Sequence, residues 1–204
     1  MPSLLLKILK KEKAKYFGIP AKTTIATISF TNMTGYVGIA EKMPLDLLPE
    51  FMNRYFEANC SAIIKHEGCI DQFEGDKIMA FWGLHHPPQE SAQLACESAI
   101  SQIKEMEKFY SWAKEQGHPC PDIRIGISTG PVVMGSIGGK TRMDFTALGK
   151  PVIIANALQD KAKTFGSCIL VDENTRKFAM NVQFGEVIEM TRGLSNIRAF
   201  PIRI

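Results

Sequence analysis

Residues 124–159 read RIGISTGPVVMGSIGGKTRMDFTALGKPVIIANALQ and carry the signals for two strands and a helix. The alternation of apolar with small or polar residues from Asp122 to Met134 predicts a strand. A Gly-Gly pair then predicts a turn into a second strand over Met143–Leu148, because glycine favours tight turns. The apolar spacing that follows predicts a helix over 151–164. This part of the chain therefore alternates strands and a helix.

The segments on both sides continue this alternation. Upstream we expect a buried strand, an amphipathic helix, a β-hairpin that turns at Glu74-Gly75-Asp76, and a longer helix. Downstream we expect a strand, a short helix and a pair of strands. These elements are expected at 24–30, 44–66, 69–82, 88–116, 167–171, 172–178 and 182–204. Their order predicts an α+β or α/β domain without an internal repeat.

The first 22 residues differ from the rest of the chain in charge. They hold six lysines and one glutamate, net +5, whereas the remaining chain holds 18 basic and 20 acidic residues. We therefore divide the chain into a leader, 1–22, and one domain over 23–204. The leader is predicted to be a basic amphipathic helix that is either solvated or in weak contact with an anionic membrane surface. The mildly acidic remainder lacks the basic face of a nucleic-acid-binding domain, so we expect no nucleic-acid partner.

The composition is typical of a folded domain with a sizeable core. Hydrophobic residues make up 45% and charged residues 22% of the 204 residues, which excludes the disordered class. No apolar run approaches the roughly 18 residues that a membrane helix needs. Five scattered cysteines without a CxxC spacing argue against a disulfide framework or a zinc site. We expect a cytoplasmic location.

Four segments in a fixed order resemble the catalytic domain of the class III nucleotidyl cyclases, the adenylate and guanylate cyclases. They are SFTNMTGYV (29–37), DQFEGDKIMAFWG (71–83), the stretch 124–159 quoted above, and TRG (191–193). The resemblance covers about residues 24–204, and the segment 124–159 is the most specific because of its length and its glycine spacing. It implies a ferredoxin-like α+β fold with a central, mostly antiparallel sheet flanked by helices.

The resemblance also implies a chemistry and a set of partners. The family converts a nucleoside triphosphate to a 3′,5′-cyclic monophosphate and pyrophosphate. Two metal ions, Mg²⁺ or Mn²⁺, activate the 3′-hydroxyl and neutralise the triphosphate. The sites lie between two domains paired head to tail. The implied partners are a purine nucleoside triphosphate and either a second copy of the chain or an intact cyclase domain in a heterodimer.

The two metal positions of the family fall on Asn32 and Asp76. Asn32 stands in the loop expected after the first strand, where the family has an aspartate, whereas Asp76 is retained at the hairpin turn. An amide offers an oxygen but no charge, and Mg²⁺ sites rely on one or two carboxylates together with the substrate's phosphates. Glu74 is a carboxylate that the family does not usually have, so it is a candidate to compensate. Strand alternation does not guarantee that Glu74 points toward the metals.

The other positions of the family divide into base, phosphate and transition-state contacts. The resemblance puts the purine contacts on Gln72, where the family has lysine, and on Thr146, a residue type that is compatible with adenine. Arg192 keeps a positive charge at the place of a phosphate-contacting lysine. Ile153 and Ala157 occupy the ribose and transition-state positions, where the family has asparagine and arginine. Neither side chain can supply the hydrogen bonds that stabilise developing charge.

These replacements predict a degenerate, regulatory cyclase-homology domain that dimerises and binds a purine nucleotide but has little or no cyclase activity. Three other interpretations stay open. In the first alternative, the chain is a slow but active adenylate or guanylate cyclase that uses Glu74 and Gln72 in altered roles. In the second, it is the lesser half of a heterodimeric cyclase. The third alternative is an interaction module with an empty cleft.

Overall fold

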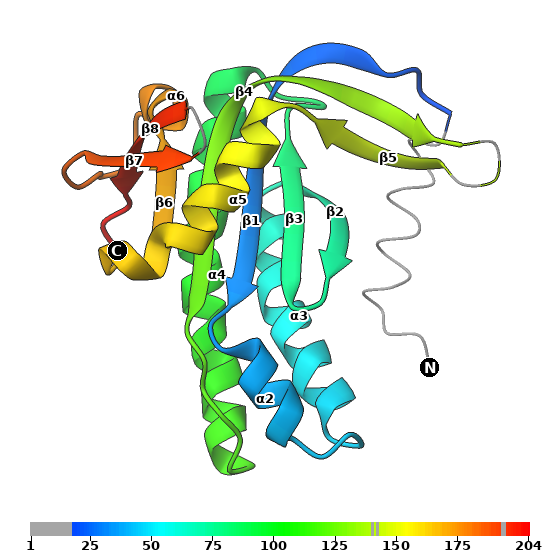
Figure 1. Cartoon of the computed structure of the whole chain (residues 1–204), viewed down its shortest axis with the longest axis vertical. Helices are drawn as coiled ribbons and strands as arrows, with labels where there is room; N and C mark the ends of the chain where they lie inside the picture. The colour runs from blue at the N-terminus through cyan, green and yellow to red at the C-terminus, as the bar shows by residue number, and fades with distance from the viewer. Residues whose placement is uncertain (1–17, 140, 142, 193–194) are drawn as a thin grey trace.

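The computed structural model describes residues 18–139, 141, 143–192 and 195–204, in which the strands of one sheet alternate with helices (Figure 1). The strands are β1 Lys22–Met33, β2 Cys69–Glu74, β3 Lys77–Trp82, β4 Ile123–Gly138, β5 Met143–Leu148, β6 Ile169–Asp172, β7 Ile188–Arg192 and β8 Ser195–Pro201. The helices are α2 Tyr36–Lys42, α3 Leu48–Lys65, α4 Pro88–Glu115, α5 Lys150–Ala162 and α6 Glu173–Phe178, and a 3-10 turn, η1, spans Lys163–Phe165. The predicted leader helix falls largely on residues 1–17, outside the described residues.

The sheet is mixed and mostly antiparallel. Its strand order is β2-β3-β1-β4-β6-β8-β7, and β5 pairs with β4 outside this path. Among the described strands, β4 and β6 form the parallel pair, and the other neighbours are antiparallel. The prediction of an α+β fold with a mostly antiparallel sheet and flanking helices is confirmed.

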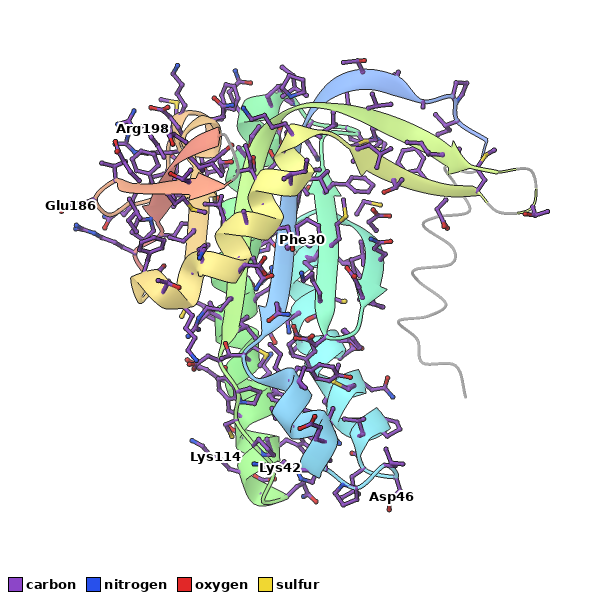
Figure 2. All side chains as sticks on the ribbon, viewed as in Figure 1. Phe30, Lys42, Asp46, Lys114, Glu186 and Arg198 are labelled. Carbon is purple, nitrogen blue, oxygen red and sulfur yellow. The ribbon has the colours of Figure 1, made fainter. Side chains whose placement is uncertain are left out.

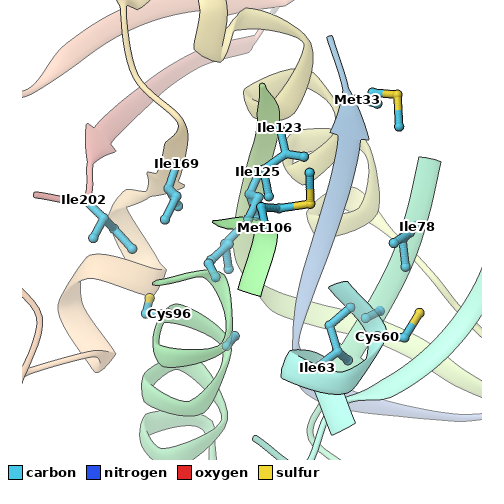
Figure 3. Packing of buried hydrophobic residues seen from close by; sticks show 14 of the residues in the cluster. Met33, Cys60, Ile63, Ile78, Cys96, Met106, Ile123, Ile125, Ile169 and Ile202 are labelled. Atoms are coloured by element: carbon cyan, nitrogen blue, oxygen red, sulfur yellow. The ribbon is translucent and has the colours of Figure 1, made fainter. Parts of the chain in front are cut away.

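Helices cover the two faces of the sheet unequally. The long helices α3 and α4 pack against one face, and α5 crosses the other face over β4 (Figure 1). Ile78 and Ile125 from the sheet meet Ile63 and Met106 from α3 and α4 in the larger hydrophobic cluster (Figure 3). Burial of these apolar side chains is the main stabilising term for the fold.

A smaller cluster fills the face that carries α5. Phe30 of β1 and Met79 of β3 form a cross-strand pair on this face, and they pack with Phe145 of β5 and Ala155 of α5. Phe30 lies near the middle of the sheet in Figure 2. The alternation of side chains along β1 therefore directs Asn32, two residues after Phe30, to the same face as α5.

Gly126 allows α5 to rest directly on the backbone of β4. A Cβ atom at this position would lie 2.1 Å from the carbonyl oxygen of Ala155 and 2.3 Å from the backbone nitrogen of Gln159. Because real Cβ atoms cannot approach so closely, the glycine sets the height of the helix above the sheet. The residues of α5 that the sequence places at the site are thereby held over β4.

The strand β4 is longer than the sequence predicts. It continues past Met134 to Gly138, and its last six residues pair with β5 to form an arm. Residues 135–138 of this arm extend past Lys22, where β1 begins. On the side away from β1, β4 pairs with β6 only up to Ile127 and with β5 only from Val133. Pro131 lies in this gap, where a missing N–H removes no bond to β5 or β6.

Three local predictions need correction. The strand β1 extends to Met33, so Asn32 lies within a strand and not in the loop expected after it. The helix expected from residue 44 begins at Leu48, because residues 44–47 form a separate turn. The short helix α2 was not predicted: it contains Gly38, has no side-chain cap and buries none of its residues.

No helix in the described part of the chain is both long and apolar enough to cross a bilayer.

Candidate functional site

The turn between β2 and β3 brings Asp76 to the end of β1. Gly75 adopts a left-handed conformation with φ of 61°, which lets the hairpin close. The Asp76 side chain is buried, and its Oδ2 atom accepts a 2.8 Å hydrogen bond from the backbone N–H of Met33. Asp76 is thus tied to the residue that follows Asn32. The bond therefore places one of the two metal positions that the resemblance implies one residue along the backbone from the other.

Burial raises the pKa of Asp76 above its ordinary value of 3.8. The hydrogen bonds from the backbone N–H groups of Met33 and of Asp76 itself, and the positive charge of Lys77, oppose this rise. Desolvation is the larger effect because removal from water penalises the charged form. A cation bound beside Asp76 would therefore stabilise the charged carboxylate, which lacks a full countercharge among the described residues.

Asn32 lies in a row of four residues that crosses the sheet. Glu74 of β2 is opposite Lys77 of β3, and Asn32 of β1 is opposite Arg124 of β4. The register of β1 with β3 pairs Thr31 with Ile78, so one further step sets Asn32 opposite Lys77. We call these four the cross-strand row. Paired residues on neighbouring strands point to the same face, so Glu74 and Asn32 share a face of the sheet.

Lys77 connects this row to α5. Its Nζ atom donates a 2.7 Å hydrogen bond to Oδ1 of Asn156 and lies 5.9 Å from the centroid of the Phe30 ring. Lys77 was not among the predicted site residues. Asn156 was not predicted to take part in the site either, although it lies next to Ala157, where the resemblance implies an arginine. The cue was available in the sequence, because Lys77 is a basic residue that follows Asp76 directly and comes just before the apolar residues of β3.

A second polar contact joins β5 to β2. The hydroxyl of Thr146 donates a hydrogen bond to Oδ2 of Asp71, whose side chain is buried. Gln72, the next residue, is exposed on β2 and lies directly after an irregularity in the pairing of β2 with β3. The two predicted base-contacting residues lie on strands that do not pair with each other, because β2 pairs with β3 and β5 pairs with β4, and the bond from Thr146 to Asp71 links these strands. Asp71 was missed, although it precedes Gln72 in the motif.

The helix α5 presents Ile153 and Ala157 in different ways. Ile153 is 57% exposed, whereas Ala157 is 3% exposed and packs with Leu158. Ala157 and the β7 residues Met190 and Thr191 line a cavity of about 160 Å³. This cavity extends from the Ala157 position toward the strand that ends at Arg192.

The match to known proteins covers most of the chain. The family model for the adenylate and guanylate cyclase catalytic domain matches residues 20–196. The chain belongs to this family. The match spans β1 through β7 and contains the cross-strand row, Asp76 and α5.

Two curated relatives agree with this assignment, and a solved structure shares the fold. The cyclase domain is 30% identical over 159 residues to adenylate cyclase 1 of Rhizobium meliloti (strain 1021), covering 78% of this chain and 24% of that protein. It is 32% identical over 159 residues to the adenylate cyclase of Anabaena cylindrica, covering 76% of this chain and 30% of that protein. The crystal structure of the adenylyl cyclase CyaB from P. aeruginosa matches with a TM-score of 0.82 at 24% identity, covering 91% of this chain and 96% of that one. The cyclase domain thus spans about a quarter to a third of these curated relatives.

The described residues of the cyclase domain offer a metal ion few ligands. No group of three or more His, Cys, Asp or Glu side chains in residues 18–139, 141, 143–192 and 195–204 is arranged to hold one. Asp76 supplies one carboxylate beside the Asn32 amide, and Glu74 is exposed two strands away from Asn32. This donor set fits one divalent cation that also binds substrate phosphates, but it does not fit two.

Arg192 is the last residue of β7, and its side chain lies outside the described part of the structure.

A groove of about 490 Å³ lies between α3 and α4 and is lined in part by Arg54, Lys65 and Trp112. None of the predicted site residues lines this groove, so we do not assign the nucleotide to it.

Proposed function

We propose that this cyclase domain dimerises head to tail and binds a purine nucleoside triphosphate between its subunits, with little or no cyclase activity, and so acts in regulation. Family membership supports the nucleotide and the paired arrangement. A bound divalent cation, Mg²⁺ or Mn²⁺, would activate the 3′-hydroxyl and neutralise phosphate charge. Asp76 is the carboxylate that would hold it, with Asn32 beside it. The chain spans only part of its curated relatives. The regulatory role and the low activity are therefore proposed for this domain and for any longer protein that contains it.

The observation that carries the proposal is the surface of α5. Ile153 projects an aliphatic side chain at the position where the family resemblance expects an asparagine for the ribose. Ala157 is buried and has no polar side-chain atom at the position of the expected arginine. Loss of one group that stabilises charge in a transition state costs about 10²–10³ in rate. In a homodimer both sites would lack these groups.

The contact of Thr146 with Asp71 supports adenine as the preferred base. A carboxylate accepts hydrogen bonds, so the hydroxyl proton of Thr146 is directed to Asp71. The hydroxyl oxygen can then only accept a further hydrogen bond. The exocyclic amino group of adenine is a donor and complements it, whereas the carbonyl oxygen at the same place in guanine does not. Gln72 can bond to either base because its amide both donates and accepts.

An apolar patch supports the dimer. Ile25 of β1, Val133 of β4 and Leu148 of β5 are 43%, 42% and 52% exposed. Val133 and Leu148 are paired across the arm, and Ile25 pairs with Pro131, two residues before Val133, so the three share one face. We call them the arm patch. Contiguous exposed apolar side chains mark protein interfaces more often than free surface.

A slow but active cyclase is the alternative, and the position of Glu74 favours it. Glu74 shares a face with Asn32 in the cross-strand row, so it is directed toward the side of the sheet where a cation would bind. Two strand spacings of about 4.8 Å separate the two backbones, and Lys77 lies between them. If Glu74 supplies the missing carboxylate, Glu74→Gln lowers cyclase activity. If activity is unchanged, this alternative is wrong.

The decisive test measures turnover and binding on the same preparation. We expect purified protein with ATP or GTP and Mg²⁺ or Mn²⁺ to form little or no cyclic nucleotide. A nonhydrolysable nucleotide should still raise the melting temperature, because a ligand that binds only the native state stabilises it. Rapid cyclic nucleotide formation that Asp76→Ala abolishes would overturn the inactive assignment. An unchanged melting temperature would overturn nucleotide binding and favour the interaction module.

The heterodimer interpretation needs a separate experiment. An intact homologous cyclase domain could supply asparagine, arginine and lysine to a site completed by Asn32 and Asp76 of this chain. Turnover that rises on mixing, and that Asp76→Ala of this chain reduces, would support a contribution in trans. Without such a rise, the homodimer is the better assignment.

A further inference from the structure

The charges of the cross-strand row differ from those that a pair of metal ions requires. From β2 to β4 the row reads Glu74, Lys77, Asn32 and Arg124, so the neutral amide lies between two cations. Adjacent strands are about 4.8 Å apart. A divalent cation bound at Asn32 would therefore face an ammonium group across one strand spacing, without a carboxylate at residue 32 to offset the repulsion.

The two cations of the row are not equivalent. The guanidinium of Arg124 donates to the carbonyl oxygen of Ile123 and lies 3.4 Å from Oδ2 of Asp122, so its charge is partly balanced. Lys77 donates to the neutral amide oxygen of Asn156, and no carboxylate forms an ion pair with it among the residues that the structure describes. An ammonium has three N–H donors. One hydrogen bond to an amide leaves two donors for a ligand.

The surroundings of Lys77 direct it toward the proposed nucleotide site. It follows Asp76 in sequence, lies opposite Asn32, and is held over the Phe30 ring on the face that carries α5. Asn156, its hydrogen-bond partner, lies next to Ala157 on α5. The ammonium is thus bonded to the residue next to the helix position that lacks an arginine, on the side chain that directly follows Asp76 in sequence.

We propose that Lys77 takes the place of one divalent cation, so that this cleft binds a polyphosphate ligand with one metal ion and one ammonium instead of two metal ions. The inference rests on the proposed nucleotide binding and specifies its charge balance. Asp76 holds the single metal ion together with the phosphates. Lys77 contacts the phosphates directly, and Asn156 orients its side chain.

The test counts metal ions on the whole protein. Equilibrium dialysis with Mn²⁺ and a nonhydrolysable ATP analogue gives the ratio of ion to nucleotide that the protein retains. We expect one Mn²⁺ per bound nucleotide in the wild type. Lys77→Met should weaken nucleotide binding by at least tenfold, or about 1.4 kcal/mol, whereas Lys77→Arg should retain most of it. Lys104→Met, which removes an exposed lysine of α4, is the matched control and should leave binding unchanged.

An exchange of charges separates ligand binding from a merely structural role of Lys77. The double variant Asn32→Asp with Lys77→Ala restores a carboxylate and removes the competing ammonium, so it should retain two Mn²⁺ per nucleotide. Two Mn²⁺ per nucleotide in the wild type would overturn the inference, as would equal affinities of Lys77→Met and wild type. In both cases the proposed nucleotide binding stands. If the wild type retains no nucleotide, the proposed function fails, and this inference fails with it.

Discussion

Asp76 accepts a hydrogen bond from the backbone N–H of Met33 at 2.8 Å, across 43 residues of sequence. The bond joins the hairpin turn to the end of β1, so Asp76 has a structural role in addition to its proposed metal contact. Substitutions at Asp76 therefore change stability as well as ligand binding. The two effects can be separated by the choice of variant.

Asp76→Ala should destabilise the fold by about 1–3 kcal/mol, because the N–H of the buried Met33 loses its acceptor. Asp76→Asn should cost less, since an amide oxygen can accept the same bond. Urea denaturation of both variants measures the difference. Equal unfolding free energies would show that the bond to Met33 does not contribute.

The raised pKa of Asp76 predicts a pH dependence of stability. The native state binds the Asp76 proton more readily than the unfolded chain does, so protonation stabilises the fold. This contribution is present at low pH and is lost as pH rises through the folded-state pKa, which lies above the ordinary 3.8. Asp76→Asn removes it. The wild type should therefore lose stability relative to Asp76→Asn as pH rises through this range, and parallel pH profiles would contradict the assignment.

Thr146 should determine the preference between ATP and GTP. We expect an ATP analogue to bind about 2–10-fold more tightly than the GTP analogue, which is the difference that one net hydrogen bond provides. Thr146→Val should remove this preference, whereas Thr146→Ser should preserve it because the hydroxyl remains. Calorimetric titration of both nucleotides gives the ratio. A wild type that prefers GTP would contradict the role assigned to the contact with Asp71.

The arm patch should hold the dimer together. Leu148→Lys places a charge among exposed apolar side chains and should raise the dimer dissociation constant at least about tenfold. Leu45→Lys is a suitable control, because Leu45 is 82% exposed in the turn before α3. Light scattering coupled to size-exclusion chromatography measures the mass of each variant. A Leu148→Lys protein that stays dimeric at the same concentrations would place the interface elsewhere.

Restoring the expected residues should raise activity. The triple variant Asn32→Asp, Ile153→Asn, Ala157→Arg should form cyclic nucleotide at least about 100-fold faster than the wild type, because it regains groups that stabilise charge. The cavity of about 160 Å³ beside Ala157 offers space for the larger side chain. A folded triple variant that binds nucleotide without a gain in turnover would show that these positions do not limit the wild type.

Much of the fold could be predicted from local patterns. The hairpin with its turn at Gly75-Asp76, the long helix α4 and the helix α5 are confirmed, because each has a strong periodic signal with a clear end. The helix α2 gave no such signal. The extension of β1 to Met33 was also missed, because pairing with β4 as well as β3 continues the strand beyond its β-branched segment.

The sequence by itself determined the family, the retained carboxylate at Asp76 and the residue types at 32, 153 and 157, since these depend only on identity and spacing. Only the tertiary structure decided that Lys77 lies opposite Asn32 and reaches Asn156, that Thr146 donates to Asp71, and that Ala157 borders a cavity. The reason is physical. Cross-strand register and the seating of α5 on Gly126 arise from packing between distant segments, and no local pattern specifies which side chains they bring together.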